Sequence, residues 1–163
     1  NTNKPYGESP VSTAMGAYFN KKAYTDPTLR RKYTRMRFWV NIRLIRYPDV
    51  LLMAAESANE KGLMGEASGY LEQVRAHARG TLTNVLPKVE SLDQSVLREA
   101  IRHERRVELG LEPDRFYDLV RWGIAQEVLQ AAGKNYQPKN ALLPLPQTEI
   151  DKSNGVLVQN PDY

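Results

Sequence analysis

The chain has 163 residues, of which 41% are hydrophobic and 26% are charged, an ordinary composition for a globular domain with a sizeable core. It has no apolar run long enough to cross a membrane as a helix. It also has no cysteine, which excludes disulfides, thiolate metal sites and thiol nucleophiles.

The formal charge of +4 is unevenly distributed. Residues 1–47 hold ten Lys or Arg against Glu8 and Asp26, a charge of +8, whereas residues 48–163 hold thirteen against seventeen acids, a charge of −4. A basic segment of this kind can mark a nucleic-acid or membrane surface, or it can lie against an acidic helical body. We favour the second interpretation and expect no nucleic-acid partner, because the basic residues are dispersed among aromatics and no predicted helix presents a continuous cationic face.

Composition also divides the chain into two predicted domains. Residues 1–47 are rich in Gly, Pro, Thr, Asn and aromatics without helical periodicity, which predicts a loop-rich lead-in. Residues 37–47 alternate partly between apolar and polar, so they predict a short strand or an extended segment. From Pro48 onward the pattern becomes helical, which predicts a second domain over residues 48–163.

The first two predicted helices form an antiparallel hairpin. An apolar stripe predicts a helix over 48–61, ended by Gly62, and a second stripe predicts another helix that ends at Gly80. The small residues Ala55, Gly62 and Ala67 resemble the tetratricopeptide pattern, in which small side chains let two helices approach closely. Only one good copy is present. A single such unit is unstable alone, so its neighbours must come from the rest of the chain or from upstream.

Two more helices and a tail follow. A third helix is predicted over about 92–110, with Ser91 or Asp93 as its N-cap, and a fourth over about 114–132, ended by Gly133. The prolines of the tail forbid regular ladders, so residues 142–161 are predicted to run extended over the helices.

Charged residues interrupt the apolar stripes of these last two helices. Glu104 continues the stripe set by Leu97 and Ile101, and Asp118 lies among apolar neighbours. Because an isolated buried carboxylate is costly, we predict a structural ion network, formed between the two helices. Its members are Glu104, Arg105, Arg106, Arg115, Asp118 and Arg121. The alternative is an acid–base active site, but every acid there has a guanidinium within helical reach, which would keep it ionised and inert.

Other sequence features indicate no catalytic, metal or cofactor site. His77 and His103 lie on different predicted helices without a metal-pair spacing, and no phosphate-binding loop or nucleophile elbow is present. Trp122 is predicted to be core. Trp39, with Tyr18 and Phe19 nearby in the sequence, is the better candidate for a ligand platform.

Four stretches of the chain resemble the SusD/RagB family, in the family's order. They are Arg46–Glu56 (RYPDVLLMAAE), Ile101–Leu109 (IRHERRVEL), Asp114–Gly123 (DRFYDLVRWG), and the tail pair 143–151 (LPLPQTEID) with 159–163 (QNPDY). Two positions depart from the family pattern: Pro113 lies where glycine is usual in the turn, and Asp162 replaces a commoner glycine.

The resemblance implies an all-α fold of tetratricopeptide-like helix pairs, of which this chain would be about the C-terminal third. It also implies a surface-exposed outer-membrane lipoprotein of the Bacteroidetes type, which captures glycans or sometimes peptides for a SusC-like TonB-dependent transporter. Because the chain opens at Asn1 without Met or a leader, the signal and lipid-attachment motifs would lie upstream, and only that lipid would contact the membrane. The alternative is a helical-repeat adaptor that docks a protein partner such as the transporter without binding the nutrient itself.

Overall fold

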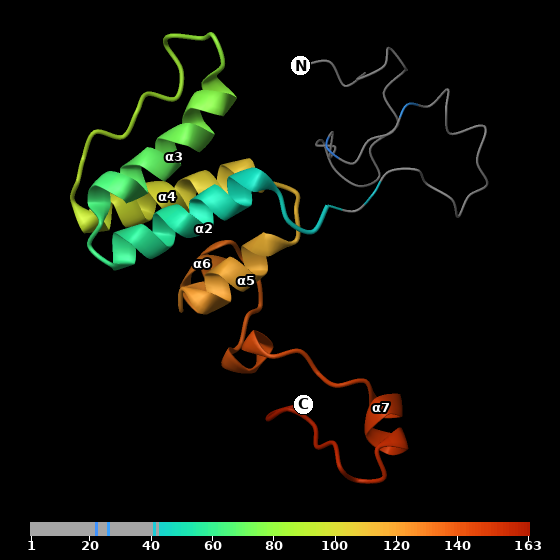
Figure 1. Cartoon of the computed structure of the whole chain (residues 1–163). Coiled ribbons are helices and arrows are strands. Elements are labelled where there is room, and N and C mark those ends of the chain that lie inside the picture. The colour runs from blue at the N-terminus through green and yellow to red at the C-terminus, as the bar shows by residue number, and fades with distance from the viewer. Residues whose placement is uncertain (1–21, 23–25, 27–40, 42) are drawn as a thin grey trace. The chain divides into compact units, whose positions relative to one another are not determined.

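The computed structural model describes residues 22, 26, 41 and 43–163, and all regular elements among residues 43–163 are helical (Figure 1). The chain divides into two compact units, residues 1–105 and residues 106–163. The predicted all-α fold is confirmed. The predicted boundary between residues 47 and 48 stays a prediction, because most of residues 1–47 lie outside the described residues.

Helices α2 (Tyr47–Glu60) and α3 (Met64–Arg79) form the predicted hairpin (Figure 1). Pro48 occupies the first turn of α2, where its missing N–H needs no acceptor. The turn closes as a Schellman motif: Gly62 has φ +77°, its N–H donates to the Asn59 carbonyl, and the Leu63 N–H donates to the Ala58 carbonyl at 2.9 Å. A positive φ suits glycine, so the sequence located this turn correctly.

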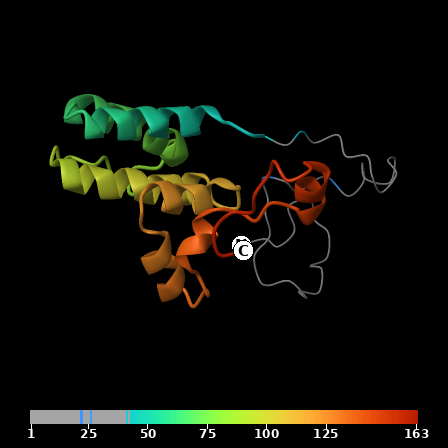
Figure 2. The same cartoon turned by 90° about the horizontal axis from the view of Figure 1, so that it is seen from below.

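Helix α4 (Gln94–Glu108) runs beside the hairpin in both views (Figures 1 and 2). Its Leu97 and Ile101 join the hairpin residues Leu52, Ala55 and Leu71 in one core, and all five are at most 1% exposed. Each of the larger of these side chains contributes about 1.5–3 kcal/mol by burial. Small residues keep the two hairpin helices close, because Ala55 and Ala67 are both fully buried. The buried face of α4 does not extend to its last turn, since Val107 is 57% exposed.

In the second unit, the predicted single helix over 114–132 is wrong. The structure has two helices, α5 (Asp114–Arg121) and α6 (Ala125–Ala131). Gly123, at φ +71°, ends α5 with a second Schellman motif in which the Ile124 N–H donates to the Leu119 carbonyl at 3.1 Å. A third Schellman motif, at Gly133, ends α6 where the sequence predicted. A small core of Leu119, Ala125 and Tyr136 lies between these turns.

The tail is only partly extended. A short 3₁₀ helix, η2 (Pro138–Ala141), directly precedes the predicted tail at 142–161. Within the tail, the prediction of an extended chain missed one α-helix, α7 (Gln147–Lys152). Pro146 directly precedes α7, and its fixed φ is compatible with a helix start. Beyond α7, the Gln159 side chain pairs with the backbone of Leu145: it accepts from the Leu145 N–H at 2.8 Å and donates to the Leu145 carbonyl at 2.9 Å.

Candidate functional site

Two buried ion pairs connect α4 to the hairpin within the first unit. Glu104 accepts a hydrogen bond from Arg75 of α3 at 2.6 Å, and Arg105 donates to Asp49 of α2 at 2.8 Å. The side chains of Glu104 and Arg105 are only 3% and 5% exposed. Adjacent helical residues point about 100° apart, so one helix sends opposite charges to two different neighbours.

These two pairs show where the predicted ion network finds partners. Burial of Glu104 and Arg105 agrees with the sequence analysis, which expected pairing between the helices at 92–110 and 114–132. The partners Arg75 and Asp49 belong to the hairpin, and the sequence analysis did not single them out. Pairing between the two predicted helices stays a prediction. Spacing along one helix says which charges need a partner, but the partner's identity depends on tertiary packing.

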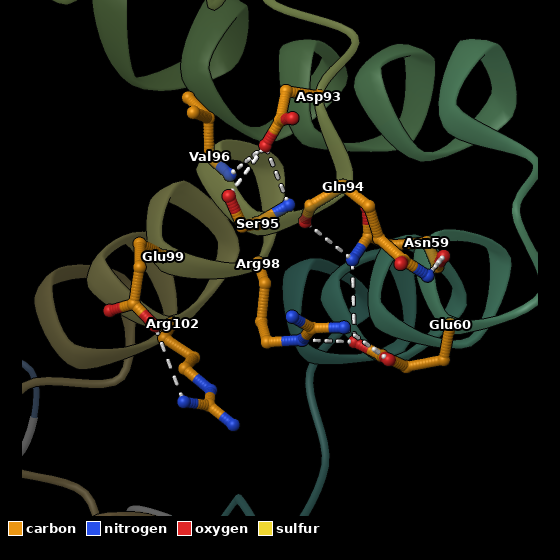
Figure 3. A network of polar contacts seen from close by, with 9 residues as sticks. All are labelled: Asn59, Glu60, Asp93, Gln94, Ser95, Val96, Arg98, Glu99 and Arg102. Carbon is orange, nitrogen blue, oxygen red and sulfur yellow. Dashed lines mark hydrogen bonds and ion pairs between the residues drawn. The ribbon is translucent and has the colours of Figure 1, made fainter.

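A cluster of polar side chains joins the N-terminal end of α4 to the C-terminal end of α2 (Figure 3). The Asn59 side chain donates to the Gln94 carbonyl at 3.1 Å, and the Gln94 side chain donates to the Asn59 carbonyl at 2.8 Å. Arg98 makes a two-pronged contact with Glu60, with both bonds at 2.7 Å. The Arg98 hydrogen bond lowers the pKa of Glu60, against the opposing effect of burial. These contacts fix which turn of α4 faces which turn of α2.

The predicted N-cap of α4 is confirmed at Asp93. Its Oδ1 accepts hydrogen bonds from the backbone N–H groups of Ser95 at 2.9 Å and Val96 at 3.0 Å, as Figure 3 shows. The Ser95 hydroxyl also donates to this carboxylate, and together these bonds lower the pKa of Asp93. The carboxylate is therefore ionised at neutral pH and complements the positive end of the helix.

Arginines of α3 hold the loop that leads to α4. Arg79 donates to the Leu86 carbonyl at 2.6 and 2.9 Å and also pairs with Glu72. Arg75 donates to the Pro87 carbonyl at 2.9 and 3.2 Å. The guanidinium that neutralises Glu104 is thus itself positioned by the backbone of the loop at residues 81–93.

In the second unit, the remaining predicted network residues gather around α5. Asp118, 4% exposed, accepts a hydrogen bond from Arg121 at 2.9 Å, an intrahelical pair three residues apart. The guanidiniums of Arg121 and Arg115 lie 4.9 and 5.9 Å from the centre of the Trp122 ring, within cation–π range. Trp122 is half-buried at the end of α5, so the prediction that it belongs to the core is wrong. Two guanidinium groups therefore lie within cation–π distance of the same ring.

The ligand platform predicted from Trp39, Tyr18 and Phe19 falls outside the described residues and stays a prediction. The two histidines, His77 and His103, are both exposed. Over the described positions 22, 26, 41 and 43–163, no three His, Asp or Glu side chains come together as a metal site. Over the same positions, no helix combines the length and the apolar character needed to span a bilayer.

These contacts define an all-helical scaffold built on one tetratricopeptide-like hairpin, with a third helix attached to it by ion pairs. A sequence profile of the SusD family matches residues 1–163, and the chain belongs to that family. The family identified from the sequence motifs is therefore confirmed.

Two curated relatives come from Formosa agariphila. The chain is 39% identical over 124 residues to "SusD-like protein P25", and the match covers 72% of this chain and 23% of that protein. It is 36% identical over 127 residues to "SusD-like protein P2", covering 73% of this chain and 25% of that protein. The crystal structure of a SusD homolog from Bacteroides thetaiotaomicron superposes with a TM-score of 0.67 at 30% identity, covering 82% of this chain and 30% of that one. The chain thus spans about a quarter of the length of these curated relatives.

Proposed function

We propose that this chain is part of a non-enzymatic, surface-exposed outer-membrane lipoprotein that captures glycans or related nutrients for a SusC-like, TonB-dependent transporter. The observation that carries the proposal is the SusD family match over the whole chain. Because the chain spans about a quarter of its relatives, capture and transport belong to the full-length protein.

The electrostatics of the described helices support a binding role without chemistry. The three buried carboxylates Asp49, Glu104 and Asp118 each contact a guanidinium at 2.9 Å or less. A carboxylate that is buried and bonded to a guanidinium is closed to a substrate and is already committed to an ion pair inside the fold. These acids are better suited to holding helices than to acid–base catalysis.

The ligand would be recognised by shape and by aromatic stacking, and Trp39, Tyr18 and Phe19 are the proposed platform. The test uses the full-length protein in a glycan array, followed by calorimetric titration of each saccharide that binds. Trp39→Ala should weaken binding about tenfold, equivalent to about 1.4 kcal/mol, while Trp39→Phe should retain most of the affinity. Tyr47→Ala is the matched control, because Tyr47 is 70% exposed on α2 and is not part of the platform.

A second candidate, a helical adaptor that docks a protein partner, is favoured by the outer face of α2. Tyr47, Val50 and Met53 follow one another at three-residue spacing and are 70%, 45% and 42% exposed. Exposed apolar residues on one helical face can form a protein-binding surface.

The saccharide titration, run beside a titration with the purified transporter, separates the two candidates. Saturable binding of a saccharide that Trp39→Ala weakens supports nutrient capture. Transporter binding that is lost in Val50→Asp, with no saccharide bound at any concentration, supports the adaptor instead.

A further inference from the structure

Arg115 differs from the other arginines of the predicted ion network. Its guanidinium is half-buried near the Trp122 ring. Among residues 43–163, no carboxylate or carbonyl accepts a hydrogen bond from it, whereas Arg105 and Arg121 both have carboxylate partners. Asp118 lies close enough to act on it through space but is bonded to Arg121. A half-buried cation often has a bonded anionic partner, and none of the carboxylates among residues 43–163 bonds to this one.

The surroundings of Arg115 make this unmatched charge more costly. Burial first, and then repulsion from the neighbouring Arg106, lower the pKa of Arg115. Arg106 is exposed and belongs to the same unit. Trp122 offsets part of the cost through its ring, by about 0.5–1 kcal/mol. Arg106 and Arg115 thus place two positive charges near each other, one of them beside an aromatic ring.

We propose that Arg115, with Arg106 beside it, docks a carboxylate side chain from the part of the full-length protein that lies outside these 163 residues. Three-quarters of each curated relative lies beyond the matched segment, so a large amount of polypeptide is there to supply it. The lead-in is a poor source, because residues 1–42 hold only Glu8 and Asp26 as carboxylates among eight Lys or Arg. A planar guanidinium can hold a carboxylate through two parallel hydrogen bonds, which fixes orientation as well as distance.

A partner of this kind extends the pattern already seen in the first unit. There, α4 is attached to α2 and α3 by one guanidinium–carboxylate pair each. The same chemistry at Arg115 would attach α5 to the remainder of the protein. Partial burial of the guanidinium makes such a pair stronger and less sensitive to salt than a surface pair.

Zero-length cross-linking of the full-length protein tests the proposal. Arg115→Lys introduces an amine that a water-soluble carbodiimide couples to a carboxylate in direct contact, and mass spectrometry identifies the joined peptides. Arg98→Lys is the matched control, because Arg98 contacts Glu60 at 2.7 Å and should yield a link between those two positions. We expect position 115 to link to an Asp or Glu outside the 163 residues, with a yield similar to the control.

Two results would overturn the proposal. One is a link at position 98 in the control together with either no link at position 115 or a link from position 115 only to residues within 1–163. The other is loss of the link at 115, but not of the control link, in millimolar inorganic sulfate, which would identify a small oxyanion as the occupant. If Arg115→Lys does not fold, phenylglyoxal labelling of the unaltered protein decides the question. Arg115 should then be protected as fully as the buried Arg105, and labelling of Arg115 at the rate of the exposed Arg43, which lies outside the proposed site, contradicts the docked carboxylate.

Discussion

Replacing Glu104 by leucine tests the role of the buried ion pairs most directly. The change leaves the apolar stripe of α4 intact but removes the acceptor at 2.6 Å from Arg75. Breaking a buried pair from one side costs about 3–5 kcal/mol, because the remaining charge is left uncompensated. We expect about 3 kcal/mol, the low end, since Arg75 keeps its bonds to the Pro87 carbonyl and is 12% exposed. For a chain of this length that corresponds to a melting temperature lower by roughly 6–12 °C.

The assay is thermal and urea unfolding followed by far-UV circular dichroism, with hydrogen exchange in α3 and α4 as a local readout. The double variant Glu104→Leu with Arg75→Met should recover to within about 1 kcal/mol of the starting stability, because the unpaired charge is gone. Glu99→Gln is the control: Glu99 is 74% exposed and its pair with Arg102 is a surface pair, so its loss should cost less than about 0.5 kcal/mol. Equal stability of Glu104→Leu and the parent, or no recovery in the double variant, would refute the reasoning.

Three further predictions follow from individual contacts. Asp118→Ala removes a buried carboxylate that Arg121 contacts, and should lower the free energy of unfolding by about 2–3 kcal/mol without weakening ligand affinity; an unchanged urea midpoint would contradict a structural role. Asp93 has a lowered pKa, so its stabilisation is complete above its ordinary pKa near 3.8 and is lost as pH falls through the lower folded value. In a plot of melting temperature against pH, Asp93→Asn should therefore lose less stability below about pH 4 than the parent does. Two parallel curves in that range would contradict a contribution from the Asp93 carboxylate. Gly123→Ala should destabilise by about 1–2 kcal/mol because φ is +71° there. Gly69→Ala, inside α3 with open space around it, should stabilise by about 0.5–1 kcal/mol, and equal signs in the two glycine variants would refute the backbone argument.

Sequence predicted the hairpin well because its signals are local. Pro48, Gly62 and Gly80 mark helix ends through backbone conformation, and the structure places the helix ends within two residues of these marks. Asp93 was predicted as an N-cap for the same reason: the hydrogen bonds of a cap reach only two or three residues along the chain.

The error in the fourth helix also has a local cause. Gly123 carried the signal that ends α5, but the apolar pattern resumes at once with Ile124 and Val128, so periodicity alone predicted an uninterrupted helix. The Ile124 N–H closes the turn on Leu119, and Ile124 then packs against the same core. A glycine followed directly by an apolar residue is therefore compatible with one continuous helix or with two helices joined by a turn. Only the backbone φ of the glycine distinguishes the two.

The ion partners could not be predicted because they lie far apart in the sequence. Asp49 and Arg105 are separated by 56 residues, and Arg75 and Glu104 by 29. The anomaly of a carboxylate within an apolar stripe was visible, and it correctly indicated burial with a partner. Choosing the partner requires the packing of α4 against α2 and α3, which no spacing within α4 contains.

The placement of these charges explains how α4 is held in one register. Its buried apolar contacts are Leu97 and Ile101, one turn apart, and a helix that slides by one turn could exchange such similar side chains at small cost. A one-turn slide moves Glu104 and Arg105 by about 5–6 Å, which separates Glu104 from Arg75 and Arg105 from Asp49 and so breaks both ion pairs. Apolar burial therefore supplies the attraction between α4 and the hairpin, while the two ion pairs penalise every other register. The double variant Glu104→Leu with Arg75→Met separates these two roles. Its free energy of unfolding should recover, because no charge is left unpaired. Its register should become less well fixed, and we expect faster hydrogen exchange along the whole of α4 as a result.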